Sequence, residues 1–133
     1  MLSLSVRALA QTLVSDWQHW HILWADERCV PLSDEASNYK AALASCPALQ
    51  QATLHPMMPP DAADADAAAA AYAATLCQLC SSSSSAAAAA PPQIDMVLLG
   101  MGPDGHCCSL FPGHELLEVS RVASSRVESS TLP

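Results

Sequence analysis

The chain has 133 residues, which is enough for one domain with a modest hydrophobic core. Its thirteen Asp and Glu against five Lys and Arg give a formal net charge of −8. This balance argues against nucleic acid and anionic membrane surfaces as partners, because both bind basic faces. No run of eighteen strongly apolar residues occurs, so we expect no membrane span.

The first half of the chain alternates between helical and strand-like segments. Apolar residues at helical spacing predict an amphipathic helix over residues 4–15. The short apolar run from His21 to Ala25 has the length of a buried strand, and a charged triplet at 26–28 follows it. Another helix is expected from about Asn38 to Cys46, with Ser37 as its N-cap.

An alanine-rich stretch, DAADADAAAAAYAATLCQLC at residues 61–80, predicts a long helix, because alanine has the highest helix propensity. Asp61 or Asp64 is suited to cap its N-terminus. Three larger apolar residues recur three or four positions apart, which places them on one side of the helix. They are Tyr72, Leu76 and Leu79.

A low-complexity stretch and a second apolar run come next. Residues 81–92, SSSSSAAAAAPP, have no amphipathic pattern and predict a flexible, solvent-exposed insertion. The run from Ile94 to Leu99 is typical of a strand covered on both faces. Two such strands separated by helices predict the α/β class, with a partial, open parallel sheet covered by helices. Ligands of these sheets bind beyond the carboxyl ends of strands, where the triplet and the loop at 100–106 follow.

This loop, GMGPDGH, contains three of the four glycines of the chain. Their clustering indicates a local backbone requirement, because glycine tolerates positive φ and lets a ligand approach the main chain. Its N–H groups could cradle an anion, and its imidazole can exchange a proton near neutral pH. The candidate residues are Gly100, Gly102 and Gly105 for the anion, and His106 with Asp104 for proton transfer.

Two other kinds of site are less well supported. The letters G-x-G-x-x-G are present, but Pro103 interrupts them and no βα unit with an acidic residue follows, which argues against dinucleotide binding. Cys77 and Cys80 lie in a helical segment and have no second matched pair, which argues against a metal or redox centre. These two motifs therefore predict neither a dinucleotide site nor a metal site.

Arg28 follows the first predicted strand and is the natural partner for a phosphate or carboxylate. Its planar guanidinium donates two parallel hydrogen bonds to such an anion. The alternative is a surface ion pair with Asp26 or Glu27.

Taken together, these segments resemble the 6-phosphogluconolactonase family, within the glucosamine-6-phosphate isomerase/deaminase-like fold. The matching segments lie between about Trp17 and Leu117, and DGH followed by SLFPGH is the most specific part. The segments are WHILWADERCVP, SNYKAAL, LHPM, the alanine helix, and IDMVLLGMGPDGHCCSLFPGH.

The resemblance implies hydrolysis of 6-phospho-glucono-1,5-lactone to 6-phosphogluconate in the oxidative pentose phosphate pathway, without a cofactor. It implies that His106 is the general base and that Asp104 supports it. Arg28, together with Asp26 and the glycine loop, would hold the sugar-phosphate lactone.

The sequence also departs from the family pattern. The family's Ser-Gly-Gly-Ser phosphate-binding loop has no counterpart here, and residues 118–133 diverge. We therefore expect residues 1–133 to form a single partial domain, whose uncovered sheet edges favour self-association. Two alternatives stay open: a non-catalytic remnant or interaction module, and a sugar-phosphate isomerase or deaminase of the same fold. The expected compartment is the cytoplasm, or the plastid if a transit peptide precedes this sequence.

Overall fold

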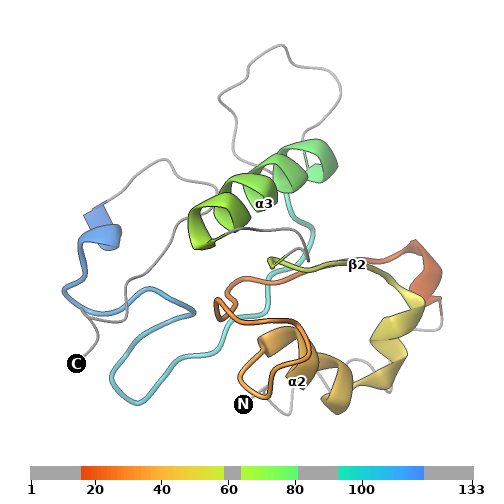
Figure 1. Ribbon diagram of the computed structural model, residues 1–133, viewed down its shortest axis with the longest axis horizontal. Helices are drawn as coiled ribbons and strands as arrows, with labels where there is room; N and C mark the ends of the chain where they lie inside the picture. Colours follow the sequence, from red (N-terminus) through yellow and green to blue (C-terminus); the bar gives the residue numbers. More distant parts are fainter. Residues whose placement is uncertain (1–15, 59–63, 81–92, 119–133) are drawn as a thin grey trace. The chain divides into compact units, whose positions relative to one another are not determined.

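The computed structural model describes residues 16–58, 64–80 and 93–118 (Figure 1). The chain divides into two compact units, residues 1–62 and 63–133. The helix expected over residues 4–15 and the low-complexity stretch at 81–92 lie outside the described residues, as does nearly all of the divergent tail. Predictions about those segments stay predictions.

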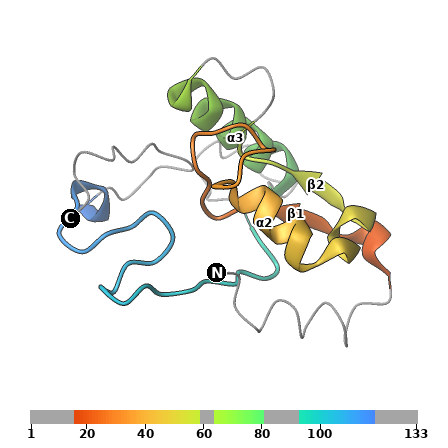
Figure 2. The same cartoon turned by 60° about the horizontal axis from the view of Figure 1, so that its bottom comes forward.

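The first unit is built on two short parallel strands, β1 (His21–Leu23) and β2 (Thr53–His55), which lie side by side (Figure 2). Helix α2 (Asn38–Ser45) and the 3-10 helix η2 (Pro47–Gln51) come between them in the chain. A second 3-10 helix, η1 (Trp17–His19), precedes β1. Parallel strands require such a crossover, and its helix confirms the predicted α/β class.

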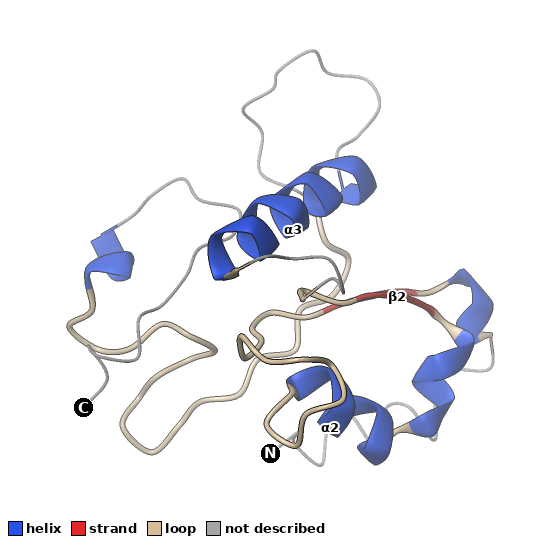
Figure 3. Cartoon of the chain, viewed as in Figure 1, coloured by secondary structure: helices blue, strands red, loops and turns tan. Residues whose placement is uncertain are grey.

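Of the two predicted strands, only the first is observed. β1 lies inside the predicted run from His21 to Ala25, but Ile94–Leu99 remains a loop (Figure 3). The apolar side chains of that loop are 45–59% exposed. The prediction of a covered strand there is wrong, because a strand needs a ladder partner and the described sheet contains only β1 and β2. β2, the actual partner of β1, contains Leu54 and His55 of the LHPM segment, where no strand is predicted.

A small hydrophobic core holds the elements of the first unit together. Its buried members come from η1, α2 with its C-cap residue, and η2, and are only 4–8% exposed. Ile22 of β1 and Leu54 of β2 pack against them, so the strands and the helices share one core. The buried residues are Trp17, Ala42, Cys46 and Leu49.

The two α-helices begin at the predicted caps. The hydroxyl oxygen of Ser37 accepts a hydrogen bond from the N–H of Lys40 (3.3 Å) at the start of α2. In the second unit, Oδ1 of Asp64 accepts from the N–H of Ala67 (2.8 Å) at the start of α3 (Ala65–Cys80). Each bond satisfies one of the N–H groups that have no partner inside a helix.

One side of α3 is buried, as its apolar spacing predicts. Tyr72 and Leu76 are 4% and 7% exposed, whereas Leu79, near the end of the helix, is 39% exposed. Among the described helices, none has both the length and the apolar character needed to cross a membrane.

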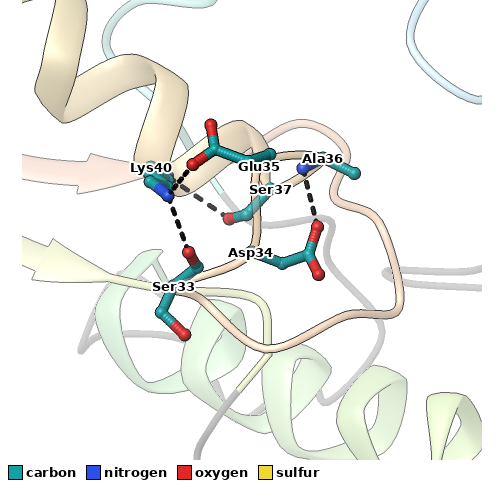
Figure 4. Close-up of polar contacts among 6 residues, drawn as sticks. All are labelled: Ser33, Asp34, Glu35, Ala36, Ser37 and Lys40. Atoms are coloured by element: carbon teal, nitrogen blue, oxygen red, sulfur yellow. Dashed lines mark hydrogen bonds and ion pairs between the residues drawn. The ribbon is translucent and has the colours of Figure 1, made fainter.

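A polar loop is tied to the first turn of α2 (Figure 4). Oδ1 of Asp34 accepts from the N–H of Ala36 (2.8 Å), which tightens the loop. The ammonium group of Lys40 donates to the carbonyl of Ser33 (2.8 Å) and to Oε1 of Glu35 (2.5 Å). The charge of Lys40 is therefore already paired.

Two histidines connect the strands of the first unit. Nδ1 of His21 and Nε2 of His55 are 2.9 Å apart, and the two rings stack with centroids 5.2 Å apart. One ring must donate and the other must accept, so the bond requires at least one neutral imidazole. Burial and the neighbouring His21 both lower the pKa of His55.

We expect the free energy of unfolding of the first unit to fall as the pH drops below about 6.5. The pKa of His55 is lower in the folded chain, so the unfolded chain takes up this proton first. The loss stops once the pH is below the folded pKa. Tryptophan fluorescence measures the effect, because all three tryptophans of the chain lie in residues 17–24.

A matched pair of variants tests this pH dependence. His55→Gln should flatten it, whereas His19→Gln should keep it, because the His19 side chain is 78% exposed and lies outside the pair. An unchanged slope in His55→Gln would show that other groups cause the loss.

Candidate active site

The glycine-rich loop of the second unit folds back on itself. The N–H of Gly102 donates to the carbonyl of His106 (2.8 Å), and the N–H of Gly105 donates to the carbonyl of Gly102 (3.0 Å). Gly105 has φ +88°, in the left-handed region that favours glycine. A second tight turn follows directly, in which Cys107 and Leu110 exchange N–H···O bonds of 3.1 and 2.9 Å.

These hydrogen bonds bear on the predicted anion cradle. The N–H groups of Gly102 and Gly105 are used inside the loop, and the N–H of His106 points at Oδ1 of Asp104 (3.4 Å). Within the described residues, the N–H of Gly100 has no main-chain acceptor. Binding of an anion by the three glycines stays a prediction, and the loop geometry favours it least for Gly102 and Gly105.

The structure brings His106 and Asp104 into direct contact. Nδ1 of the imidazole and Oδ1 of the carboxylate are 2.5 Å apart. The side-chain hydrogen bond from His106 is the main cause that lowers the pKa of Asp104. The carboxylate is therefore ionised at neutral pH and can only accept, so the proton of a neutral ring lies on Nδ1. Nε2 then keeps its lone pair and can act as a base.

Two further residues hold the imidazole. The ring of Phe111 stacks on that of His106, with centroids 4.7 Å apart and planes at 27°. A Cβ at Gly102 would overlap Nδ1 and Cε1 of the ring and would lie 2.9 Å from Oδ1 of Asp104. The ring therefore occupies space that is open only because residue 102 is glycine.

The charged triplet after β1 has three different local environments. Asp26 is tied to α2, because Nδ2 of Asn38 donates to both its Oδ1 (3.1 Å) and its carbonyl (3.2 Å). The carboxylate of Glu27 accepts from main-chain N–H groups at the start of α2. The guanidinium of Arg28 is exposed and has no hydrogen bond or ion pair within the described part of the chain. It is therefore available to an anion, and the alternative ion pair with Asp26 or Glu27 is not formed.

Sequence reasoning missed Glu27 and Phe111 as parts of the site. The position of Glu27, after a strand and before a helix that starts with Ser-Asn, could have indicated its role. A carboxylate there can accept hydrogen bonds from the first N–H groups of the helix. An aromatic residue five positions after a histidine, in a loop with turn-forming glycines, is a weaker signal for ring stacking.

Arg28 lies in the first unit and His106 in the second. That the charged triplet and the loop at 100–106 bind the same ligand stays a prediction. Where the structure describes the chain, no three His, Cys, Asp or Glu side chains gather as ligands for a metal ion. The site residues are therefore a histidine hydrogen-bonded to a carboxylate in one unit, and in the other an exposed arginine with no ion pair among the described residues.

Comparison with known proteins places this loop in a family. The sequence model of the family described as glucosamine-6-phosphate isomerases/6-phosphogluconolactonase matches residues 2–132. The chain belongs to this family. The match confirms the resemblance inferred from the loop. The parallel strands and helices of the first unit agree with the α/β fold of this family.

Several relatives within the family are named as lactonases. "Probable 6-phosphogluconolactonase 4, chloroplastic" of Oryza sativa subsp. indica is 39% identical over 121 residues, 89% of this chain and 37% of that protein. "Probable 6-phosphogluconolactonase 4" of Arabidopsis thaliana is 45% identical over 107 residues, 74% of this chain and 41% of that protein. "6-phosphogluconolactonase 3" of Saccharomyces cerevisiae strain YJM789 is 37% identical over 120 residues, 81% of this chain and 44% of that protein.

The chain thus spans 37–44% of the length of these three relatives. No solved structure matches it. Some relatives are named as chloroplastic and others are not.

Proposed function

We propose that the chain carries the general base and an anion-binding arginine for the hydrolysis of 6-phospho-glucono-1,5-lactone to 6-phosphogluconate. This is a step of the oxidative pentose phosphate pathway. The pair of His106 and Asp104, 2.5 Å apart, is the observation that supports it most directly. Relatives that are 37–45% identical and are named 6-phosphogluconolactonases also support this proposal.

In this proposal His106 acts through Nε2, while Asp104 keeps the ring proton on Nδ1. Nε2 removes a proton from water as the water oxygen attacks the carbonyl carbon of the lactone. The tetrahedral intermediate collapses with cleavage of the bond between that carbon and the ring oxygen. The imidazolium returns its proton to the departing oxygen, which becomes a hydroxyl group. A lactone needs positioning and one proton acceptor, so neither a covalent nucleophile nor a cofactor enters the proposal.

Arg28 is proposed to bind the phosphate of the substrate, because its guanidinium is exposed and unpaired in the described residues. Asp26 is already bonded to Asn38, which favours a supporting role over direct contact with the lactone. Gly100 is the glycine of the loop whose N–H is best placed to contribute.

Lactone hydrolysis by the chain and by a chimaera tests the proposal. In the chimaera, residues 16–118 replace the matching segment of the Arabidopsis relative. Formation of 6-phosphogluconate is measured with a coupled dehydrogenase, above the spontaneous hydrolysis of the lactone. We expect activity in the chimaera and little or none in the 133-residue chain. Turnover of glucosamine 6-phosphate in place of the lactone would favour the isomerase or deaminase alternative and contradict the proposal.

Arg28→Lys in the chimaera should raise KM by about tenfold, because lysine keeps the charge but loses the bidentate fork. Lys40→Arg is the matched control, since the Lys40 ammonium is already bonded to Glu35 and Ser33. It should leave KM unchanged. Steady-state kinetics measure both, and an unchanged KM in Arg28→Lys would remove Arg28 from the binding site.

Self-association is a second proposal, supported by the apolar loop of the second unit. Five side chains between Ile94 and Leu99 are 45–59% exposed, and Met101 is 80% exposed. Such a patch favours association over exposure to water. For the compartment we propose the cytosol, as one Arabidopsis relative and the yeast relative carry no chloroplast designation. The Oryza relative and a second Arabidopsis relative are named as chloroplastic.

A further inference from the structure

We propose that Glu27 is a positioning residue, which fixes the main chain of Arg28 to the first turn of α2 and so presents its exposed guanidinium to an anion. This inference rests on the proposed role of Arg28 in binding the substrate phosphate. It adds to that role a residue that never touches the substrate.

The carboxylate of Glu27 joins two segments that are ten or more residues apart. Oε1 accepts from the N–H of Arg28 (2.8 Å) and from the N–H of Asn38 (2.6 Å). Oε2 accepts from the N–H of Tyr39 (2.8 Å) and from the hydroxyl of Ser37 (3.1 Å). Ser37 is only 1% exposed, so this anchor is shielded from water on the helix side.

These contacts also decide where an anion can bind. The N–H groups at a helix N-terminus attract anions such as phosphate. At α2 the Glu27 carboxylate already accepts the N–H groups of Asn38 and Tyr39, so a phosphate would have to displace it. The guanidinium of Arg28, which has no partner among the described residues, remains open to an anion.

The residue before Glu27 strengthens the anchor. Asp26 receives two hydrogen bonds from Nδ2 of Asn38, so two consecutive residues are bonded to the start of α2. The main chain at Arg28 is therefore ordered before a ligand arrives. Ordering in advance improves affinity, because less conformational entropy is lost on binding.

The test uses the 133-residue chain and 6-phosphogluconate, the stable product, as the probe. Its dissociation constant is followed from the Nε–Hε signal of arginine and from backbone amide signals in NMR titrations. Glu27→Ala should weaken binding by about three- to tenfold, the scale of ordering one side chain. Glu27→Gln should have a smaller effect, because its amide keeps one acceptor oxygen. Glu35→Gln, the matched control at the same end of α2, should leave affinity unchanged.

A double-mutant cycle with Arg28→Ala separates positioning from a general structural role. Arg28→Ala should weaken binding by tenfold or more, and adding Glu27→Ala to it should weaken binding no further. If Glu27 only caps α2, Glu27→Ala will lower the unfolding midpoint but leave the affinity of the folded chain unchanged, which overturns the inference. If Arg28→Ala itself has no effect, the proposed role of Arg28 fails and the inference fails with it. Should Glu27→Ala not fold, Glu27→Gln replaces it in the cycle, with a smaller expected loss of affinity that Arg28→Ala should likewise abolish.

Discussion

Replacing His106 by Asn in the chimaera should lower kcat by about 10²–10⁴, the usual contribution of a general base. Asparagine keeps a similar size and some hydrogen bonding, but it cannot accept a proton near neutral pH. KM should change little, because the proposed phosphate contact lies at Arg28. Initial rates above the spontaneous background, at saturating lactone, measure the loss.

The control for this substitution is His19→Asn, which removes an imidazole that is 78% exposed and lies in the first unit. It should leave kcat unchanged. If His106→Asn retained nearly full kcat, His106 would not be the base, and the proposed mechanism would fail.

Gly102→Ala should lower kcat by about 10², because displacement of a catalytic group by about 1 Å costs this much. The added methyl group would overlap the His106 ring and crowd Oδ1 of Asp104, so the imidazole must move and its bond to Asp104 must lengthen or break. Nitrogen-15 shifts of the imidazole report the tautomer directly. We expect the fraction with the proton on Nδ1 to fall.

Gly100→Ala serves as the matched control for this effect, because a Cβ at residue 100 meets no atom within 4 Å. It should leave the pair of His106 and Asp104 intact in the same spectra. If Gly102→Ala kept the tautomer and the rate of the parent chain, the ring would be free to adjust and Gly102 would have no positioning role.

The features that the sequence predicts well are local ones. Ser37 and Asp64 cap their helices as expected, because the preference of Ser and Asp for the N-cap depends on N–H groups only two or three residues away. The contact between Asp104 and His106 is similarly local, since the two residues are separated by one position. Loop geometry and helix starts can therefore be inferred from short segments.

The features that the sequence predicts poorly depend on distant partners. The run from Ile94 to Leu99 has the composition of a buried strand, but composition does not supply a ladder partner. β2 is only three residues long and lies next to Pro56, so its pairing with β1 has almost no local signal. The four hydrogen bonds of Glu27 include three to residues ten to twelve positions away, which no periodicity reveals.

The described partners of the His106 imidazole all lie between Gly102 and Phe111, a span of ten residues. A loop of that length closes in about 10–100 ns. The pairing of β1 with β2 instead joins His21 to Thr53 across 32 residues, and its larger loop costs more entropy to close. The arrangement around His106 has low contact order, and its described contacts involve no residue of the first unit. During synthesis, these contacts can therefore form as soon as Phe111 has left the ribosome, whether or not β1 and β2 have paired.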